Sequence, residues 1–357
     1  MTTAAGPLGD SRETVGRPVF LGSGAFVATE SNLETPHMNT TRFFSPRVVP
    51  ALSLAISAVL AAACGDRTMP TSPMPTAAAF GKGFTPGGPN SLPLRGRIAF
   101  SSNVTGDQEI YTMNEDGGDI VRLTYSPGQD DAPVWSPDGK KISFVRTSPT
   151  AAEVFVVNAD GSGVKQLTFL GLPNIGGIAW SPDSRRIVFA AGSSPFYDDY
   201  DLYLMNASGG GLAKLTSDLG SEVHPSWSPD GTQLAFASNR TSQYNIFLMK
   251  PDGSNQTQFS FCVVGCDFPE WSPDGTRMAF SNMNLAAIEV APISDFNLKT
   301  TLITGAVFPK WSPDGVKLVF VSQVSTEIET INADGSGQKQ LTSMNSVELY
   351  PSWGRKQ

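Results

Sequence analysis

The segment FPEWSPDG, residues 268–275, is one version of a frame that contains every tryptophan of the chain. The other versions are APVWSPDG (132–139), GIAWSPDS (177–184), HPSWSPDG (224–231), FPKWSPDG (308–315) and YPSWGRKQ (350–357). From Trp135 to Trp353, successive tryptophans lie 45, 47, 44, 40 and 42 residues apart. A repeat of this length is typical of the blades of a β-propeller, so the frame predicts a radially repeated, all-β fold.

Each repeat also predicts four strands. Ser-Pro-Asp-Gly favours a type I turn, because proline presets its second position and glycine accepts a positive φ at its end. Nine residues after each of the first five tryptophans stands a phenylalanine that ends an alternating apolar stretch, as Phe144 does. A third apolar stretch follows, for example EVFVVN (153–158), and a fourth ends in Leu-Thr in four repeats. Four antiparallel strands make one propeller blade.

The two ends of the repeat region complement each other. GRIAF (96–100) matches the second strand of a repeat, whereas YPSW (350–353) matches the first. We therefore expect the C-terminal strand to pair with the N-terminal strands and close a ring, which removes free sheet edges. The sequence predicts a six-bladed β-propeller over residues 95–357, with blades at 133–170, 178–217, 225–260, 269–304, 309–343 and a composite of 349–354 with 96–126.

The residues before the repeats predict export. From Met38, a basic segment is followed by the 16-residue apolar run VVPALSLAISAVLAAA (48–63) and then by Cys64. This order is typical of a signal peptide over 38–63, and the run is shorter than the roughly 20 residues that a spanning helix needs. Ala61-Ala62-Ala63-Cys64 resembles a lipobox, which predicts a lipid on Cys64. The alternative is an ordinary signal peptidase cut, with Cys64 incidental.

Two further segments flank the signal. Residues 1–37 carry acidic side chains where a signal would be basic, so we expect Met38 to be the true start and 1–37 to be a non-native extension. Residues 64–94 are rich in Pro, Gly, Ser and Thr without a period, which favours a flexible tether.

The composition of the chain indicates which classes of partner it can bind. The formal net charge is −8, which argues against the basic surface that nucleic acid binding needs. Only 16% of residues are charged, while 35 glycines and 27 prolines favour short strands joined by turns. We expect no nucleic acid partner and no membrane contact except through the lipid.

The P-x-W-S-P-D-G, I-x-F and Leu-Thr elements together resemble the propeller repeat of the TolB family over residues 95–357. This resemblance implies a periplasmic, envelope-associated propeller whose face binds a protein. Similar repeats occur in prolyl oligopeptidase-like peptidases and in oligogalacturonate lyases. The former use a G-x-S-x-G nucleophile elbow, which this sequence lacks, and the latter hold a metal with several histidines, whereas His224 is the only histidine after His37.

Acidic residues precede several of the repeated tryptophans. We expect the loops that enter the innermost strands to bring six residues to one mouth of the central tunnel: Asp130, Asp131, Glu222, His224, Asp267 and Glu348. Such a mouth can hold a cation such as Ca²⁺ or receive a basic peptide. The alternative is that these are solvated loop acids. The Asp-Gly turns lack the further acids of a calcium loop, so we interpret them as hairpin turns.

Cys262 and Cys266 are the other cysteines of the chain. In an oxidising, exported setting their spacing favours a local disulfide rather than a metal site.

These patterns favour a monomeric protein-binding or scaffold module, lipid-anchored in the bacterial periplasm or cell envelope. We expect its partner to be an envelope protein or a peptidoglycan-associated one. No residue is assigned a catalytic role. The alternative function is a metal-dependent lyase or hydrolase that acts at the acidic mouth.

Overall fold

The computed structural model describes residues 96–194, 198–218, 220–344 and 346–354. The expectations about the extension 1–37, the signal peptide 38–63, Cys64 and the tether 64–94 lie outside these residues. Within the described ranges, no helix has the length and apolar character that crossing a membrane requires.

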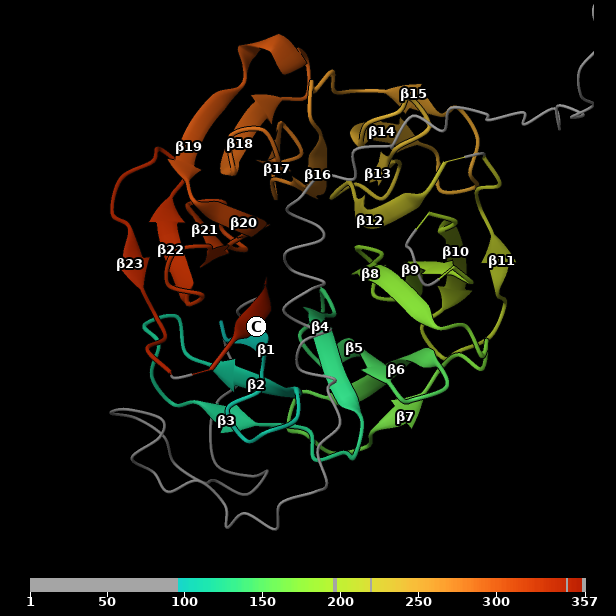
Figure 1. Cartoon of the computed structure of the whole chain (residues 1–357), viewed down its shortest axis with the longest axis vertical. Helices are drawn as coiled ribbons and strands as arrows, with labels where there is room; N and C mark the ends of the chain where they lie inside the picture. The colour runs from blue at the N-terminus through green and yellow to red at the C-terminus, as the bar shows by residue number, and fades with distance from the viewer. Residues whose placement is uncertain (1–95, 195–197, 219, 345, 355–357) are drawn as a thin grey trace, which may run out of the picture. The chain divides into compact units, whose positions relative to one another are not determined.

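The strands form six sheets of four antiparallel strands each, arranged radially around a centre (Figure 1). Three blades are β4 (Gln129–Trp135), β5 (Lys141–Thr147), β6 (Ala152–Asn158), β7 (Lys165–Gln166); β8 (Asn174–Trp180), β9 (Arg186–Gly192), β10 (Asp201–Asn206), β11 (Ala213–Lys214); and β12 (Glu222–Trp227), β13 (Leu234–Ser238), β14 (Asn245–Met249), β15 (Thr257–Gln258). The next two are β16 (Cys266–Trp271), β17 (Arg277–Asn282), β18 (Ala287–Pro292), β19 (Thr300–Thr304); and β20 (Ala306–Trp311), β21 (Lys317–Ser322), β22 (Ile328–Asn332), β23 (Lys339–Gln340). A short 3₁₀ helix, η2 (Phe296–Leu298), precedes β19.

The sixth blade closes the ring. Its order is β24-β1-β2-β3, with β24 (Glu348–Trp353) beside β1 (Ile98–Ser102), followed by β2 (Glu109–Met113) and β3 (Val121–Arg122). Ile98 is paired with Trp353 and Ala99 with Ser352. The predicted closure by the two ends of the repeat region is therefore confirmed.

The repeated sequence elements have clear structural roles. In the first frame, Gly139 N donates to Ser136 O at 2.8 Å and Ser136 Oγ donates to Asp138 Oδ1 at 2.6 Å, so Ser-Pro-Asp-Gly forms the hairpin turn that was predicted. The Leu-Thr pair ties the outer strand to the third strand, because the Thr124 hydroxyl accepts from Ile110 N at 2.9 Å. The phenylalanines of the second strands are fully buried and form the centres of the blades.

Antiparallel connections place two kinds of loop on each face of the ring. The face where the innermost strands begin carries the loops between blades and the loops that join second to third strands; we call it the entry face. The opposite face carries the Ser-Pro-Asp-Gly turns and the loops that join third to fourth strands; we call it the turn face. Because β1 is a second strand, Gly96 and Arg97, which precede it, lie on the turn face.

Candidate functional site

Each innermost strand contains a bulge three residues before its tryptophan. The ladder between β16 and β17, for example, shifts register between Asp267 and Glu270. The residues at this position have a positive φ in all six blades: Ala132 (52°), Gly177 (102°), His224 (49°), Phe268 (54°), Phe308 (59°) and Tyr350 (49°). A left-handed backbone costs a residue other than glycine about 1–2 kcal/mol, so the fold holds five of these residues against a local preference.

Four of the bulge residues form a continuous row of rings. Adjacent ring centroids are 3.8 Å apart for His224 and Phe268, 4.5 Å for Phe268 and Phe308, and 4.6 Å for Phe308 and Tyr350. We call this row the aromatic crescent; it follows four consecutive innermost strands, β12, β16, β20 and β24, around the centre of the ring (Figure 1). Ala132 and Gly177 occupy the same position in the other two blades, so the row is open on that side.

A hydrogen bond fixes the first ring of the crescent. His224 Nδ1 lies 2.7 Å from Asp267 Oδ1, and Asp267 is nearly buried, with 4% of its surface exposed. The Phe268 backbone N–H donates to the same carboxylate oxygen at 2.7 Å. Asp267, one of the predicted mouth residues, thus links β12 to the bulge of β16 through these two hydrogen bonds.

Two other predicted mouth acids form ion pairs with arginines of their own blades. Asp130 is buried and accepts from the Arg146 guanidinium at 2.6 and 2.7 Å. Glu222 is equally buried and accepts from Ser238 Oγ at 2.9 Å and from Arg240 at 3.2 Å. Burial nevertheless raises the pKa of Glu222 above its ordinary value, because desolvation outweighs these partners.

Glu348 occupies the same position in β24 but has a different environment. It is buried and accepts from Ser346 Oγ at 2.5 Å and Ser102 Oγ at 3.2 Å. Burial, together with the neighbouring carboxyl group of Glu327, raises the pKa of Glu348 to about 8. At neutral pH this carboxyl group is therefore mainly protonated.

Asp131 is the remaining predicted acid. It accepts a hydrogen bond from Ser101 Oγ in the neighbouring blade, and burial raises its pKa. It lies four residues before its tryptophan, as Asp267 does, whereas Asp130, Glu222 and Glu348 lie five before theirs.

The structure places the predicted acids within β4, β12, β16 and β24 rather than on loops, because the innermost strands begin earlier than expected; β4 begins at Gln129 instead of residue 133. Side chains four and five residues before the tryptophan therefore lie on opposite faces of the sheet. In the ranges that the structure describes, no three His, Cys, Asp or Glu side chains are grouped so that they could hold a metal ion.

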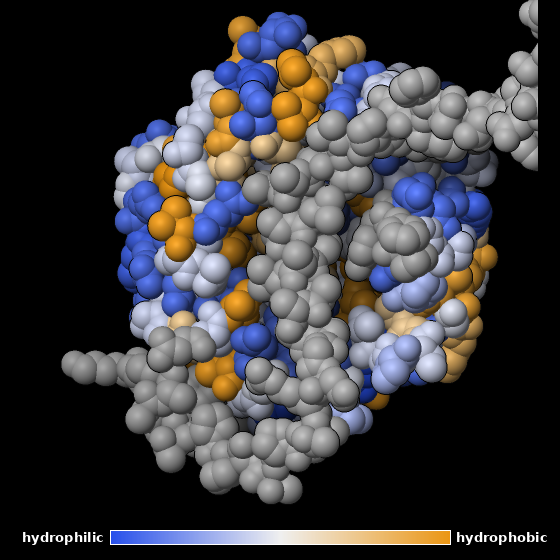
Figure 2. All heavy atoms as spheres, in the orientation of Figure 1, coloured by the Kyte–Doolittle hydropathy of each residue, from blue (hydrophilic) through white to orange (hydrophobic). Residues whose placement is uncertain are grey.

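The entry face also carries apolar side chains that water contacts. Three aromatic residues each stand three positions after the end of an outer strand, and they are 67%, 80% and 72% exposed: Tyr125, Phe169 and Phe261. Val263, Leu285 and Val324 lie on loops of the same face. We call these six residues the apolar rim. Figure 2, which shows one face, has hydrophobic residues in separate groups around the ring.

The disulfide lies in one of the rim loops. Cys262 and Cys266 are bonded in the structure, with their Cα atoms 5.8 Å apart, and Val263 stands between them. The bond closes a short loop next to Phe261 and so restricts the backbone that presents these apolar side chains.

The aromatic crescent was not predicted from the sequence, although a signal for it exists. Aligning the six frames on tryptophan gives Ala, Gly, His, Phe, Phe and Tyr at one position, and of these only His224 is among the predicted mouth residues. A column with four ring-bearing residues just before a proline would have indicated a shared structural position.

Comparison with known proteins now identifies the family. The model of the TolB β-propeller domain matches residues 80–194 and 173–357. The chain belongs to the TolB β-propeller family. Among solved structures, TolB from Acinetobacter baumannii superimposes with a TM-score of 0.64 at 21% identity, over 73% of this chain and 67% of that one. At that identity, the likeness supports the fold alone.

Curated relatives match over shorter segments. A TolB homolog of Chlorobium luteolum is 35% identical over 146 residues, which are 40% of this chain and 31% of the relative. A Bacillus subtilis protein described as an uncharacterized peptidase, YuxL, is 29% identical over 145 residues, which are 40% of this chain and 20% of the relative. The matched part thus spans less than a third of either relative.

Proposed function

We propose that this TolB-type propeller is an exported, lipid-anchored module of the bacterial cell envelope that binds a protein partner with its entry face. The observation that carries the proposal is the apolar rim. Three aromatic residues at equivalent positions, Tyr125, Phe169 and Phe261, expose most of their surface. Exposed aromatic side chains are typical anchors of protein interfaces, because they bury a large area with little loss of conformational freedom.

The two faces differ in the character of their exposed apolar residues. The large hydrophobic residues exposed on the turn face are all aliphatic and are Val164, Leu212, Leu298 and Val316. In the part of the chain that the structure describes, every strongly exposed aromatic residue lies on the entry face. This asymmetry supports the entry face as the binding surface.

The attachment of the chain supports the same orientation. Gly96 and Arg97 lie on the turn face, so a flexible tether from a lipid on Cys64 would enter the propeller opposite the entry face and leave that face clear of the attachment. An envelope protein or a peptidoglycan-associated partner would then meet the apolar rim. Replacement of Cys64 by Ser should release the protein from the membrane fraction; a membrane-bound C64S variant would refute the anchor.

The binding proposal is tested by crosslinking and affinity capture from intact envelopes. A variant with Phe169→Ser and Phe261→Ser should recover the crosslinked partner at least tenfold less, as expected for the loss of interface anchors worth 1.4 kcal/mol or more. A matched variant with Val164→Ser and Leu212→Ser on the turn face should recover it normally. Equal recovery with both variants would overturn the proposal.

The alternative of a metal-dependent lyase or hydrolase has no observation in its favour. The predicted acids are used in hydrogen bonds and ion pairs within and between blades, and in the described ranges they form no group of three that could hold an ion. We therefore propose no second function.

A further inference from the structure

One position of the third strand divides the blades into two kinds. In four blades an aromatic residue stacks on the phenylalanine of the second strand, and the ring centroids are 5.7–5.9 Å apart, as for Phe144 and Phe155 or Phe236 and Phe247. In the two remaining blades a glutamate replaces that residue. Glu289 is paired in register with Phe280, and Glu329 with Phe320.

The first of these two blades supplies its own substitute for the missing ring. Lys299 Nζ lies 2.9 and 3.1 Å from the two carboxylate oxygens of Glu289. The ring of Phe296, on η2, lies 5.5 Å from that of Phe280, and the Lys299 ammonium stands 5.7 Å from the centroid of Phe296. An ammonium group and an aromatic ring, both from the loop before β19, thus fill the space over Phe280 and Glu289.

The second blade lacks both groups. Thr300 is opposite Val290 and Lys339 is opposite Thr330, so the residue equivalent to Lys299 is Gln338. Gln338 Nε2 donates to Glu329 Oε2 at 2.7 Å, and Ser325 Oγ lies 3.4 Å from the other oxygen. Among the residues that the structure describes, Glu329 has no ion-pair partner and Phe320 has no aromatic partner.

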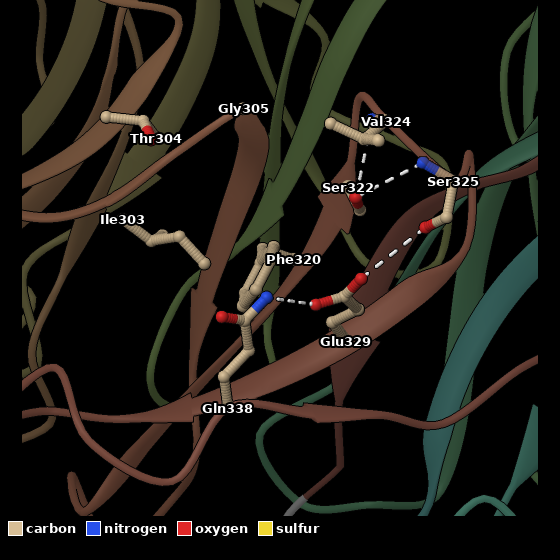
Figure 3. Close-up of a pocket in the computed structure, with 9 residues that line it drawn as sticks. All are labelled: Ile303, Thr304, Gly305, Phe320, Ser322, Val324, Ser325, Glu329 and Gln338. Carbon is tan, nitrogen blue, oxygen red and sulfur yellow. Dashed lines mark hydrogen bonds between the residues drawn. The ribbon is translucent and has the colours of Figure 1, made fainter.

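A cavity of about 280 Å³ occupies the corresponding space (Figure 3). Ile303 and Thr304 of β19 form one wall, and Phe320, Glu329 and Gln338 form the other. Glu329 is 7% exposed and Phe320 is buried. The cavity therefore combines a largely desolvated carboxylate with an apolar wall, and its size is near the lower end of ligand pockets, which hold about 300–1,000 Å³.

We propose that this cavity binds an alkylammonium group that is carried next to an apolar or aromatic group. Lys299 and Phe296 show which chemistry completes the same framework in the adjacent blade. An ammonium ion donates up to three hydrogen bonds, which suits the Glu329 carboxylate, the Ser325 hydroxyl and the Gln338 side-chain carbonyl. The proposal does not depend on partner binding at the entry face.

Phenethylamine and the dipeptide acetyl-Phe-Lys-amide are suitable probes, added to the full-length protein and followed by titration calorimetry. The first represents a free amine and the second a lysine side chain of a protein, so the tighter probe identifies the source. Two neutral controls, 2-phenylethanol and the dipeptide with an acetylated lysine, should bind at least tenfold more weakly, because each lacks the charge-assisted hydrogen bond.

Two variants make the test decisive. Glu329→Gln should weaken binding of the amines about tenfold or more. Gln338→Lys should abolish it and raise the unfolding midpoint, because it recreates the internal pair of Lys299 and Glu289. Absence of binding by both amines to the wild-type protein, or equal binding to wild type and Q338K, would overturn the proposal.

Discussion

Ile98 and Trp353 are paired across β1 and β24, so the first and last strands of the described chain lie side by side in one sheet. Trp353 and Leu349 are both buried, with 9% and 8% of their surfaces exposed, and Ser352 Oγ accepts from Trp135 N of the next blade at 3.1 Å. The C-terminal strand therefore closes the ring and also contacts the neighbouring blade.

Deletion of residues 348–357 should lower the unfolding midpoint by roughly 10 °C or more. Two buried side chains contribute about 1.5–3 kcal/mol each, and 1 kcal/mol corresponds to about 2–4 °C in a domain of this size. Thermal unfolding followed by circular dichroism measures the shift. Val324→Ser, at a residue that is 89% exposed, is the control and should change the midpoint little. A midpoint unchanged by the deletion would refute the closure.

The raised pKa of Glu348, which lies beside Glu327, predicts that the free energy of unfolding decreases as pH rises. The pKa of Glu348 is raised from 4.5 to about 8 in the folded protein, so the fold favours the protonated form. The contribution of Glu348 to the free energy of unfolding is fully present below pH 4.5 and is lost as pH rises through about 8. The loss is at most about 1.4 kcal/mol per pH unit for one proton.

Denaturant unfolding from pH 5 to 9 tests this prediction. Glu348→Gln keeps the shape and hydrogen-bonding capacity of the protonated acid without its titration, so its stability should depend less on pH than that of the wild type. Identical pH profiles for the two proteins would contradict the role assigned to Glu348.

The bulge at Phe268 predicts that glycine is a more stable replacement than alanine, which is the reverse of the usual order in a strand. Phe268→Gly should be more stable than Phe268→Ala by about 1 kcal/mol, because glycine adopts the φ of 54° without steric cost. At Lys310, in the regular part of β20, the order should be the usual one, with glycine about 0.5–1 kcal/mol less stable than alanine. Alanine being the more stable replacement at both positions would exclude a strained bulge.

The disulfide predicts a modest contribution to stability. Replacing Cys262 and Cys266 together by Ser should cost about 2 kcal/mol, since the bond restricts only a short loop of the unfolded chain. Mass spectrometry of protein from the envelope should show a gain of two hydrogens on reduction. A pair of free thiols before reduction would contradict the bond.

The fold was predictable because its determinants recur in the sequence. The tryptophan frames specify the inner strand and its turn, and the two incomplete ends, GRIAF and YPSW, complement each other. The register of the acids was not predictable in this way. The bulge before each proline interrupts the alternation of side chains, so the face of β4 on which each of Asp130 and Asp131 lies could not be counted from Trp135.

The cavity beside Glu329 was missed for a different reason. Its distinguishing feature is the absence of a lysine at Gln338, which becomes apparent only when β19 and β23 are aligned through their pairing with the third strands. The short outer strands contain too few residues for the sequence alone to define that alignment.

The most direct test of entry-face binding is photo-crosslinking in intact envelopes. A photoreactive amino acid would replace Phe169 on the entry face in one variant and Leu212 on the turn face in another; both positions are exposed, at 80% and 47%. We expect a discrete crosslinked partner from position 169 and none from position 212. A partner captured only from position 212 would contradict it.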